Sequence, residues 1–354
     1  MASYPTFNLN DPRKLTGMYT DEEIKDMSDE EYRNNLYSLW TNYCVSESYE
    51  PGSTFKPVTV ASALEEGVVK DGDTYVCKGF ETVADYKLKC HVFSTIGSHG
   101  SLTVEQALMN SCNPYMIHLA LEMGNSRFAY YQSLFGFGKI TGIDLPGETT
   151  GIVYGDRMTT IDAACNSFGQ TINVNMMQMM AAYCSIINGG MLYQPHIVKR
   201  IESANGEVVK EYKANLVRQT ITASTSKLLR RYLKNTVEEG TAKKAGVTGY
   251  SVAGKTGTAQ KGDRKDNKWI ISFIGHAPAE NPKFAIYVVI DEPYGTTGTS
   301  GSSADVLTLT HNILEKLLPY MNVYKDASDE YEDTSSSPDE LTVDGIPAGT
   351  ASSN

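Results

Sequence analysis

The 354-residue chain is long enough for one large domain or two modest ones. Its 41% hydrophobic content, with 10% aromatic residues, predicts a globular protein with a packed core. No stretch approaches the roughly 18 consecutive apolar residues of a transmembrane helix. The net charge is −11, and eight acidic residues and one lysine place −7 of it in residues 325–354. Neither part offers a basic face for phosphate backbones, so nucleic acid is not an expected partner.

The segment TDEEIKDMSDEEYRNNLYSLW (20–40) predicts short acidic helices, because Thr20 and Ser28 each stand three residues before a glutamate, the spacing of a capping box. The Pro-Gly pair of YEPGSTFKP (49–57) then stops whatever precedes it. A helix that begins at or beside Ser53 places Ser53 and Lys56 one turn apart on one face. It also leaves unpaired backbone N–H groups near the serine oxygen. This arrangement suits a nucleophile and its base, although an N-cap serine and a surface lysine would give the same pattern.

The segment YVCKGFETVADYKLKCHVF (75–93) resembles a hairpin flanked by Cys77 and Cys90. A cross-strand disulfide and two free thiols are equally compatible with it. The six cysteines form no C-x-x-C pair, and the six histidines form no H-E-x-x-H cluster. The sequence therefore predicts no metal site and no cofactor.

The next segments predict two helices separated by a tight elbow. SLTVEQALMN (101–110) begins with a T-x-x-Q capping box at Thr103 and stops at SCN (111–113). Pro114 then opens NPYMIHLALEMG, with Asn113 placed to cap it. Ser111 and Asn113 are therefore expected in the elbow between the two helices.

The following stretch predicts an ordered glycine-rich loop (135–151), a methionine-rich helical region (161–187), and strands with an Asn-Gly turn (193–219). An amphipathic helix is predicted from 222 to 240. Three β-branched and aromatic runs then predict an antiparallel sheet: GYSVAGKTGTAQ, WIISFIGHAP and KFAIYVVIDEP. ADVLTLTHNILEKLLPYM (304–321) predicts an apolar helix that covers the sheet. The Ser-, Asp- and Glu-rich residues 324–354 predict a disordered acidic tail.

Three short motifs gain weight from their order and setting. S-x-x-K occurs at Ser53 and again at Ser224, and S-x-N occurs at Ser111 and again at Ser203, so neither is specific alone. K-T-G occurs once, at Lys255. Penicillin-binding proteins and class A β-lactamases use this set of motifs: a serine at a helix start, a serine in an elbow and a lysine on a strand.

The sequence resembles the transpeptidase domain of class B penicillin-binding proteins, of the cell-division or sporulation type. The resemblance covers residues 1–323 in the family's order. It rests on MASYPTFNLNDP, YEPGSTFKP, NSCNPYMIHLALEMG, TGIDLPGETTG, NSFGQTINVNMMQMMAAY, GYSVAGKTGTAQ and SFIGHAPAENPKFAIYVVIDEP. It implies an α+β fold in which helices cover an antiparallel β-sheet beside an all-helical subdomain. By this comparison the chain is N-terminally truncated. It lacks the first helix and strands of the domain, and MASYP corresponds to the end of the second strand.

The resemblance and the chemistry together imply a role for each motif. Ser53 is the expected nucleophile and Lys56 its base, with a pKa lowered by burial and by the like charge of Lys255. Ser111 is expected to relay a proton to the leaving amine, and Asn113 to hold Lys56 and the substrate amide.

The K-T-G strand is expected at the rim of the cleft, where the substrate adds as a further strand. Lys255, Thr256 and Thr258 would bind the terminal carboxylate of a D-Ala-D-Ala stem peptide. Gly257 would allow close backbone approach. The backbone N–H groups of Ser53 and Thr258 would form the oxyanion hole.

The implied function is a peptidoglycan D,D-transpeptidase that cross-links the cell wall, with a possible carboxypeptidase side activity and covalent inhibition by β-lactams. Its expected place is the extracytoplasmic face of the bacterial plasma membrane. A glycosyltransferase or division complex is an expected partner, bound through missing N-terminal parts. The alternatives are a β-lactamase, a non-catalytic β-lactam sensor and a division scaffold without turnover. The length and the LPGE loop argue against a β-lactamase.

Overall fold

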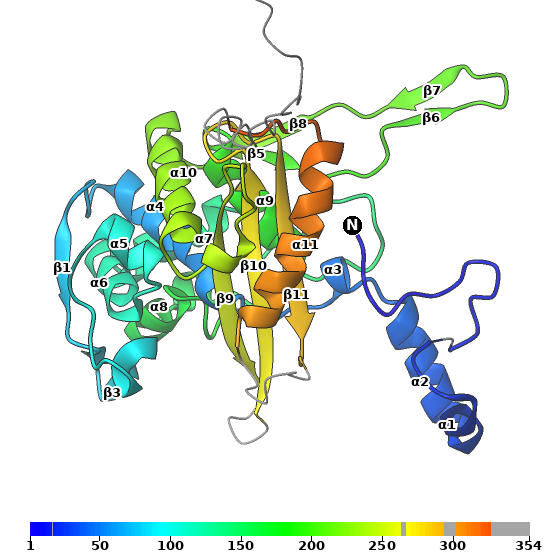
Figure 1. Cartoon of the computed structure of the whole chain (residues 1–354), viewed down its shortest axis with the longest axis horizontal. Helices are drawn as coiled ribbons and strands as arrows, with labels where there is room; N and C mark the ends of the chain where they lie inside the picture. The colour runs from blue at the N-terminus through cyan, green and yellow to red at the C-terminus, as the bar shows by residue number, and fades with distance from the viewer. Residues whose placement is uncertain (16, 263–266, 294–301, 327–354) are drawn as a thin grey trace, which may run out of the picture.

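The computed structural model describes residues 1–15, 17–262, 267–293 and 302–326. Within these ranges the central sheet has three antiparallel strands in the order β11-β10-β9 (Figure 1): β9 (Ala253–Lys261), β10 (Lys268–Ala277) and β11 (Phe284–Asp291). Ile274 of β10 lies opposite Lys255 on one side and Tyr287 on the other. The strands predicted from the β-branched and aromatic runs are confirmed.

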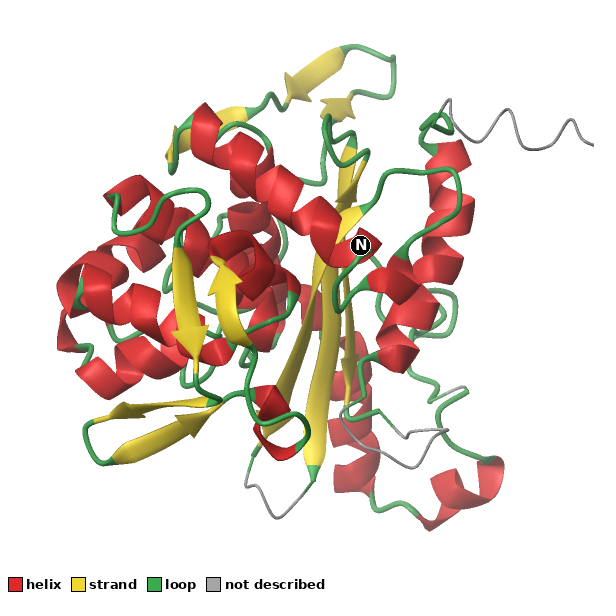
Figure 2. Cartoon of the chain, turned by 60° about the vertical axis from the view of Figure 1, so that its left-hand side comes forward, coloured by secondary structure: helices red, strands yellow, loops and turns green. Residues whose placement is uncertain are grey.

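Helices cover both faces of this sheet (Figures 1 and 2). On one face lies α11 (Ala304–Tyr320), whose leucines 307, 314 and 318 recur at helical spacing and pack with Ile271 and Phe273 of β10. On the other face, Ile274 belongs to the large core formed by the helices between residues 56 and 238. Because side chains alternate along a strand, Phe273 and Ile274 face these two cores in turn.

The large core belongs to a helical subdomain that contacts β9 and β11 through α10 and α9. Thr103, Thr159 and Asn175 each cap a helix of this group with a complete capping box. The helices are α4 (Lys56–Glu66), α5 (Val104–Met109), α6 (Asn113–Met123), α7 (Asn125–Leu134), α8 (Thr160–Asn166), α9 (Met176–Ile187) and α10 (Ala223–Glu238). The α+β architecture predicted from the sequence is confirmed.

Short paired strands lie outside the central sheet. β1 (Thr74–Cys77) pairs with β4 (Gly100–Thr103), and β2 (Phe80–Val83) pairs with β3 (Tyr86–Lys89). The predicted hairpin between Cys77 and Cys90 is therefore the β2–β3 pair. Elsewhere, β5 (Met191–Gln194) pairs with β8 (Asn215–Gln219). The predicted Asn-Gly turn joins β6 (Arg200–Glu202) to β7 (Val208–Glu211), which projects from the body (Figure 1).

The first 46 residues extend to one side of the sheet and carry α1 (Asp21–Asp26), α2 (Asp29–Trp40) and α3 (Tyr43–Ser46) (Figure 1). Thr20 caps α1 with the predicted capping box, whereas Ser28 caps α2 by accepting from the Glu31 N–H alone. The prediction that MASYP ends a strand is wrong. Residues 1–5 form no strand, because none of the described strands supplies a partner for their backbone groups. All but the first three residues of the predicted tail 324–354 lie outside the described residues.

None of the helices in the described ranges has both the length and the apolar character needed to cross a bilayer.

Candidate active site

Ser53 lies in a one-turn 3₁₀ helix, η1 (Gly52–Phe55), that runs directly into α4. The Gly52 N–H donates to the Gly169 carbonyl at 2.9 Å, which fixes the start of this turn. Gly52 has φ +55°, and a Cβ there would lie 2.5 Å from the Thr258 carbonyl oxygen. Only glycine therefore allows η1 to contact β9 this closely. The prediction of a helix beginning beside Ser53 is confirmed, with 3₁₀ geometry at its first turn.

Lys56 is fully buried one turn after Ser53. Its Nζ donates to three oxygens: the Ser111 carbonyl at 2.6 Å, Ser111 Oγ at 3.0 Å and Asn113 Oδ1 at 2.7 Å. Burial lowers the pKa of Lys56 to about 8, and the nearby thiols of Cys90 and Cys112 oppose this shift. A lysine in this environment is partly neutral near neutral pH, as a general base requires.

Ser111 and Asn113 occupy the predicted elbow between α5 and α6. Ser111 has φ +55°, and its Oγ donates to Ser53 Oγ at 3.0 Å. The prediction that Asn113 caps the second helix is wrong. Cys112 holds the cap position and makes no side-chain cap bond. Asn113 cannot serve as the cap because its amide is engaged elsewhere: Oδ1 accepts from Lys56, and Nδ2 donates to the Lys89 carbonyl at 3.3 Å.

The K-T-G segment lies on β9, whose edge contacts η1. Lys255 is fully buried, and its Nζ donates to the Thr256 carbonyl at 3.2 Å and to Thr256 Oγ1 at 3.3 Å. Burial first, and then the charge of Lys56, holds the pKa of Lys255 well below its ordinary value. A Cβ on Gly257 would lie 2.8 Å from Thr54 Cγ2 and 2.9 Å from the Pro51 carbonyl oxygen, so the packing of β9 against η1 leaves no room for a side chain there.

A cavity of about 410 Å³ joins these segments. Five predicted residues line it: Ser53, Ser111, Asn113, Thr256 and Thr258. Lys56 and Lys255 have no exposed surface and lie beneath it. Sequence reasoning singled out none of the other lining residues as site residues, because they come from loops, helix ends and the start of β10 that are far apart in the chain: His91, Phe168, Gln170, Thr241, Trp269 and Ser303.

Residues 1–315 match the family described as the penicillin binding protein transpeptidase domain. The chain belongs to this family. The resemblance deduced from the motifs is confirmed, and the arrangement described above is this transpeptidase domain's candidate active site.

Relatives of known name support the assignment. The chain is 41% identical to Stage V sporulation protein D of Bacillus subtilis, over 80% of this chain and 44% of that protein. It is 32% identical to peptidoglycan D,D-transpeptidase FtsI of Escherichia coli K12, over 81% of this chain and 46% of that protein. The crystal structure of penicillin binding protein 3 from Mycobacterium tuberculosis with aztreonam superimposes with a TM-score of 0.72 at 29% identity, covering 80% of this chain and 65% of that one. The chain thus spans less than half the length of the two curated relatives.

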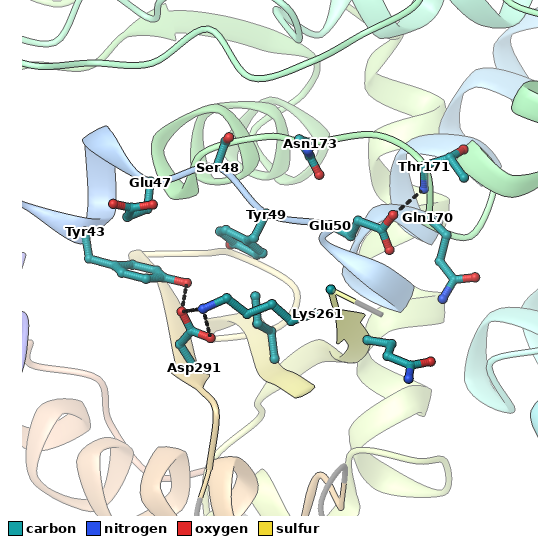
Figure 3. A pocket seen from close by; sticks show the side chains of 13 residues that line it. Tyr43, Glu47, Ser48, Tyr49, Glu50, Gln170, Thr171, Asn173, Lys261 and Asp291 are labelled. Carbon is teal, nitrogen blue, oxygen red and sulfur yellow. Dashed lines mark hydrogen bonds and ion pairs between the residues drawn. The ribbon is translucent and has the colours of Figure 1, made fainter. Parts of the chain in front are cut away.

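A second pocket of the transpeptidase domain, of about 480 Å³, adjoins the first at Gln170 (Figure 3). Lys261, at the end of β9, donates to Asp291 at 2.8 Å, and Tyr43 donates to the same carboxylate at 3.1 Å. On the opposite wall Glu50 accepts from the Thr171 N–H at 2.8 Å. This second pocket therefore extends the active-site cavity past Thr258, and charged and polar side chains line it.

The prediction of no metal-ligand cluster needs correction. Cys77, Cys90, His99 and Cys112 lie together, with their ligand atoms all within 4.8 Å of one another. The C-x-x-C and H-E-x-x-H patterns detect only ligands that are close together in the sequence. These four residues belong to four separate segments, and only the fold brings them together. The cysteines are free thiols in the structure, which corresponds to the second of the two alternatives for Cys77 and Cys90.

Proposed function

We propose that the chain is a peptidoglycan D,D-transpeptidase that forms an acyl-serine intermediate on Ser53. The observation that carries this proposal is the hydrogen-bonded path from Ser53 through Ser111 to a buried lysine of lowered pKa, beside the K-T-G strand. Ser53 Oγ attacks the carbonyl between the two D-alanines, and the terminal D-alanine leaves as an amine. An amine of a second stem peptide then attacks the acyl-enzyme and restores Ser53. Attack by water instead would give carboxypeptidase activity.

The contacts of Lys56 determine where its lone pair points. A neutral amine has two hydrogens and one lone pair, and two of its three neighbours, the Ser111 carbonyl and Asn113 Oδ1, can only accept hydrogen bonds. With both hydrogens donated there, the lone pair faces Ser111 Oγ. No direct hydrogen bond joins Ser53 to Lys56 among the described residues. The donors described above are those of a protonated Lys56; when Lys56 is neutral, the Ser111 hydroxyl turns from Ser53 to Lys56 and accepts from Ser53 instead. The proton of Ser53 then moves to Ser111 as that of Ser111 moves to Lys56. The reverse path protonates the leaving amine.

The K-T-G strand supplies the substrate's docking edge. We assign Thr256 and Thr258 to the terminal carboxylate, with Lys255 beneath the cavity acting through Thr256 Oγ1, to which its Nζ donates. The N–H groups of Ser53 and Thr258 are assigned to the oxyanion. The contact of Gly52 with the Thr258 carbonyl supports this assignment, because it holds the two backbone segments side by side. Such donors are typically worth roughly 3–4 kcal/mol each in transition-state stabilisation.

This assignment also sets the direction of the donor peptide. Its carboxylate lies at Thr256, above Lys255, and its reacting carbonyl at Thr258, so its preceding residues run toward Lys261 and the pocket of Figure 3. We expect an N-acylated tripeptide ending in D-Ala-D-Ala to acylate Ser53 faster than the matched dipeptide. Both rates are measured by quenching the reaction at a series of times and determining the amount of acyl-enzyme by mass spectrometry. Equal rates for the two peptides would exclude a contribution from this pocket.

The function is tested by intact-mass analysis after incubation with a labelled penicillin. The chain is expected to gain one stable adduct, and Ser53→Ala is expected to gain none. Ser224→Ala is the matched control, because Ser224 stands in the second S-x-x-K motif on an exposed face of α10 and its loss leaves the cavity intact. Circular dichroism establishes that each variant is folded.

The alternatives predict other outcomes of this experiment. An adduct that disappears within seconds would identify a β-lactamase. A stable adduct without cross-linking of stem peptides would favour a sensor or scaffold, and no adduct on a folded chain would contradict the catalytic proposal. The substrate places the reaction on the extracytoplasmic face of the plasma membrane. The higher identity to the Stage V sporulation relative, 41% against 32% for FtsI, favours a sporulation role.

A further inference from the structure

The Cys77, Cys90, His99 and Cys112 cluster lies beside the proposed proton path and takes no part in it. Cys77 ends β1, Cys90 follows β3, His99 precedes β4 and Cys112 caps α6. The three cysteines are each at most 3% exposed. Elements that are far apart in the sequence therefore bring three thiols and one imidazole to a single point.

The spacing of the ligand atoms matches a tetrahedral site. Zinc–sulfur and zinc–nitrogen bonds of about 2.3 and about 2.0 Å place two sulfurs about 3.8 Å apart and a sulfur and a nitrogen about 3.5 Å apart. His99 Nδ1 lies 3.5 Å from Cys90 Sγ and 3.7 Å from Cys77 Sγ. All four atoms lie within 4.8 Å of one another, so small side-chain adjustments would close the site. A disulfide would engage only two of them.

A backbone N–H group orients one of the sulfurs as well. The Gly79 N–H donates to Cys77 Sγ at 3.4 Å. Gly79 has φ +88°, and a Cβ there would collide with the Gly97 carbonyl, so this turn requires glycine. Hydrogen bonds of this kind fix the position and charge of coordinating thiolates.

We propose that Cys77, Cys90, His99 and Cys112 bind one Zn²⁺ ion in a closed tetrahedral site of three sulfurs and one nitrogen. Zinc fits best because thiolate and imidazole ligands in tetrahedral geometry favour it over magnesium, calcium or manganese. Binding releases the thiol protons to solvent and changes no oxidation state. With four protein ligands the ion has no open position, so its role is structural.

The ion would also position the catalytic elbow. Cys112 stands between Ser111 and Asn113, and Cys90 follows Lys89, whose carbonyl accepts from Asn113 Nδ2. A metal bound to Cys90 and Cys112 therefore ties together the two segments that hold Asn113 against Lys56. This consequence rests on the proposed function, whereas metal binding itself does not.

The test is metal analysis of the purified 354-residue chain, kept reduced, loaded with Zn²⁺ and desalted. We expect one zinc per chain, and Co²⁺ loading should give the visible bands of tetrahedral thiolate coordination. Cys77→Ser and His99→Gln should each lower the zinc content at least severalfold. Cys184→Ser is the matched control, because Cys184 lies on α9 outside the cluster and its loss should leave one zinc bound.

Less than about 0.1 zinc per wild-type chain, or a Co²⁺ spectrum without thiolate bands, would overturn the proposal whether or not the variants fold. A chain that holds no zinc and is lighter by the two hydrogens of a disulfide would also overturn it. The effect on the elbow is read separately. Removing zinc with a chelator should slow penicillin acylation at least tenfold, and adding Zn²⁺ should restore it. An unchanged rate would refute the positioning role and leave the metal site standing.

Discussion

Lys56→Met is expected to slow acylation of Ser53 by about 10²–10⁴-fold, the usual contribution of a positioned general base. Methionine fills the buried space but has no lone pair for the proton of Ser111. It also leaves the Ser111 carbonyl and Asn113 Oδ1 without their donor, which costs roughly 1–3 kcal/mol of stability for each unsatisfied group. The rate constant for labelled-penicillin acylation, measured on a variant shown to be folded, is the readout.

Lys227→Met is the control for this variant. Lys227 is the exposed lysine of the second S-x-x-K motif, so its loss should leave the acylation rate unchanged. A folded Lys56→Met variant that acylates at the wild-type rate would contradict the assignment of Lys56 as the base.

The pH profile provides a second readout for Lys56. The protonated amine has no lone pair, so the wild-type rate should rise about tenfold per pH unit below the pKa of about 8 and level off above it. The ionisable groups that face Lys56 are Lys255 on β9, His91 on η2 (His91–Ser94), and the thiols of Cys90 and Cys112. Burial lowers the pKa of His91 from 6.5, so this imidazole titrates below the pH range in which Lys56 loses its proton. Lys56→Met should show a flat profile.

Gly52→Ala is expected to slow acylation by about 10²-fold, because a misplacement of about 1 Å at a reacting centre has effects of that size. The added Cβ would lie 2.5 Å from the Thr258 carbonyl oxygen and 3.3 Å from the Thr258 nitrogen. The strand or the turn must move, and the proposed oxyanion donors on Ser53 and Thr258 separate. Acylation kinetics measure the effect, and thermal unfolding measures the accompanying loss of stability.

Gly67→Ala separates this steric effect from backbone strain. Gly67 also has positive φ, +76°, at the C-terminal end of α4, but a Cβ there meets nothing within 4 Å. Its replacement should lower stability by about 1–2 kcal/mol and leave the acylation rate unchanged. If both variants slow acylation equally, close approach to Thr258 is not the reason that position 52 is glycine.

Local patterns in the sequence predicted most of the fold. Capping boxes, the Pro-Gly break and the alternation of the last three strands depend on residues within about four positions of one another, so no tertiary information is needed to read them. The same holds for Ser53 and Lys56, which a single helical turn places together. Local rules failed at Asn113, whose amide engages the distant Lys56 and Lys89 instead of the helix end. They also failed at MASYP, where a strand would have needed a partner.

The sequence by itself determined which residues could act: a serine and a lysine at a helix start, a second serine in an elbow, and a lysine on a strand. Only the tertiary structure decided what those groups can do. The pKa of Lys56 falls because the fold buries it, and its proton path exists because Ser111, 55 positions along the chain, lies between it and Ser53. The Cys77, Cys90, His99 and Cys112 cluster has the same origin. Burial and long-range proximity belong to the folded chain as a whole, and no spacing between neighbouring residues encodes them.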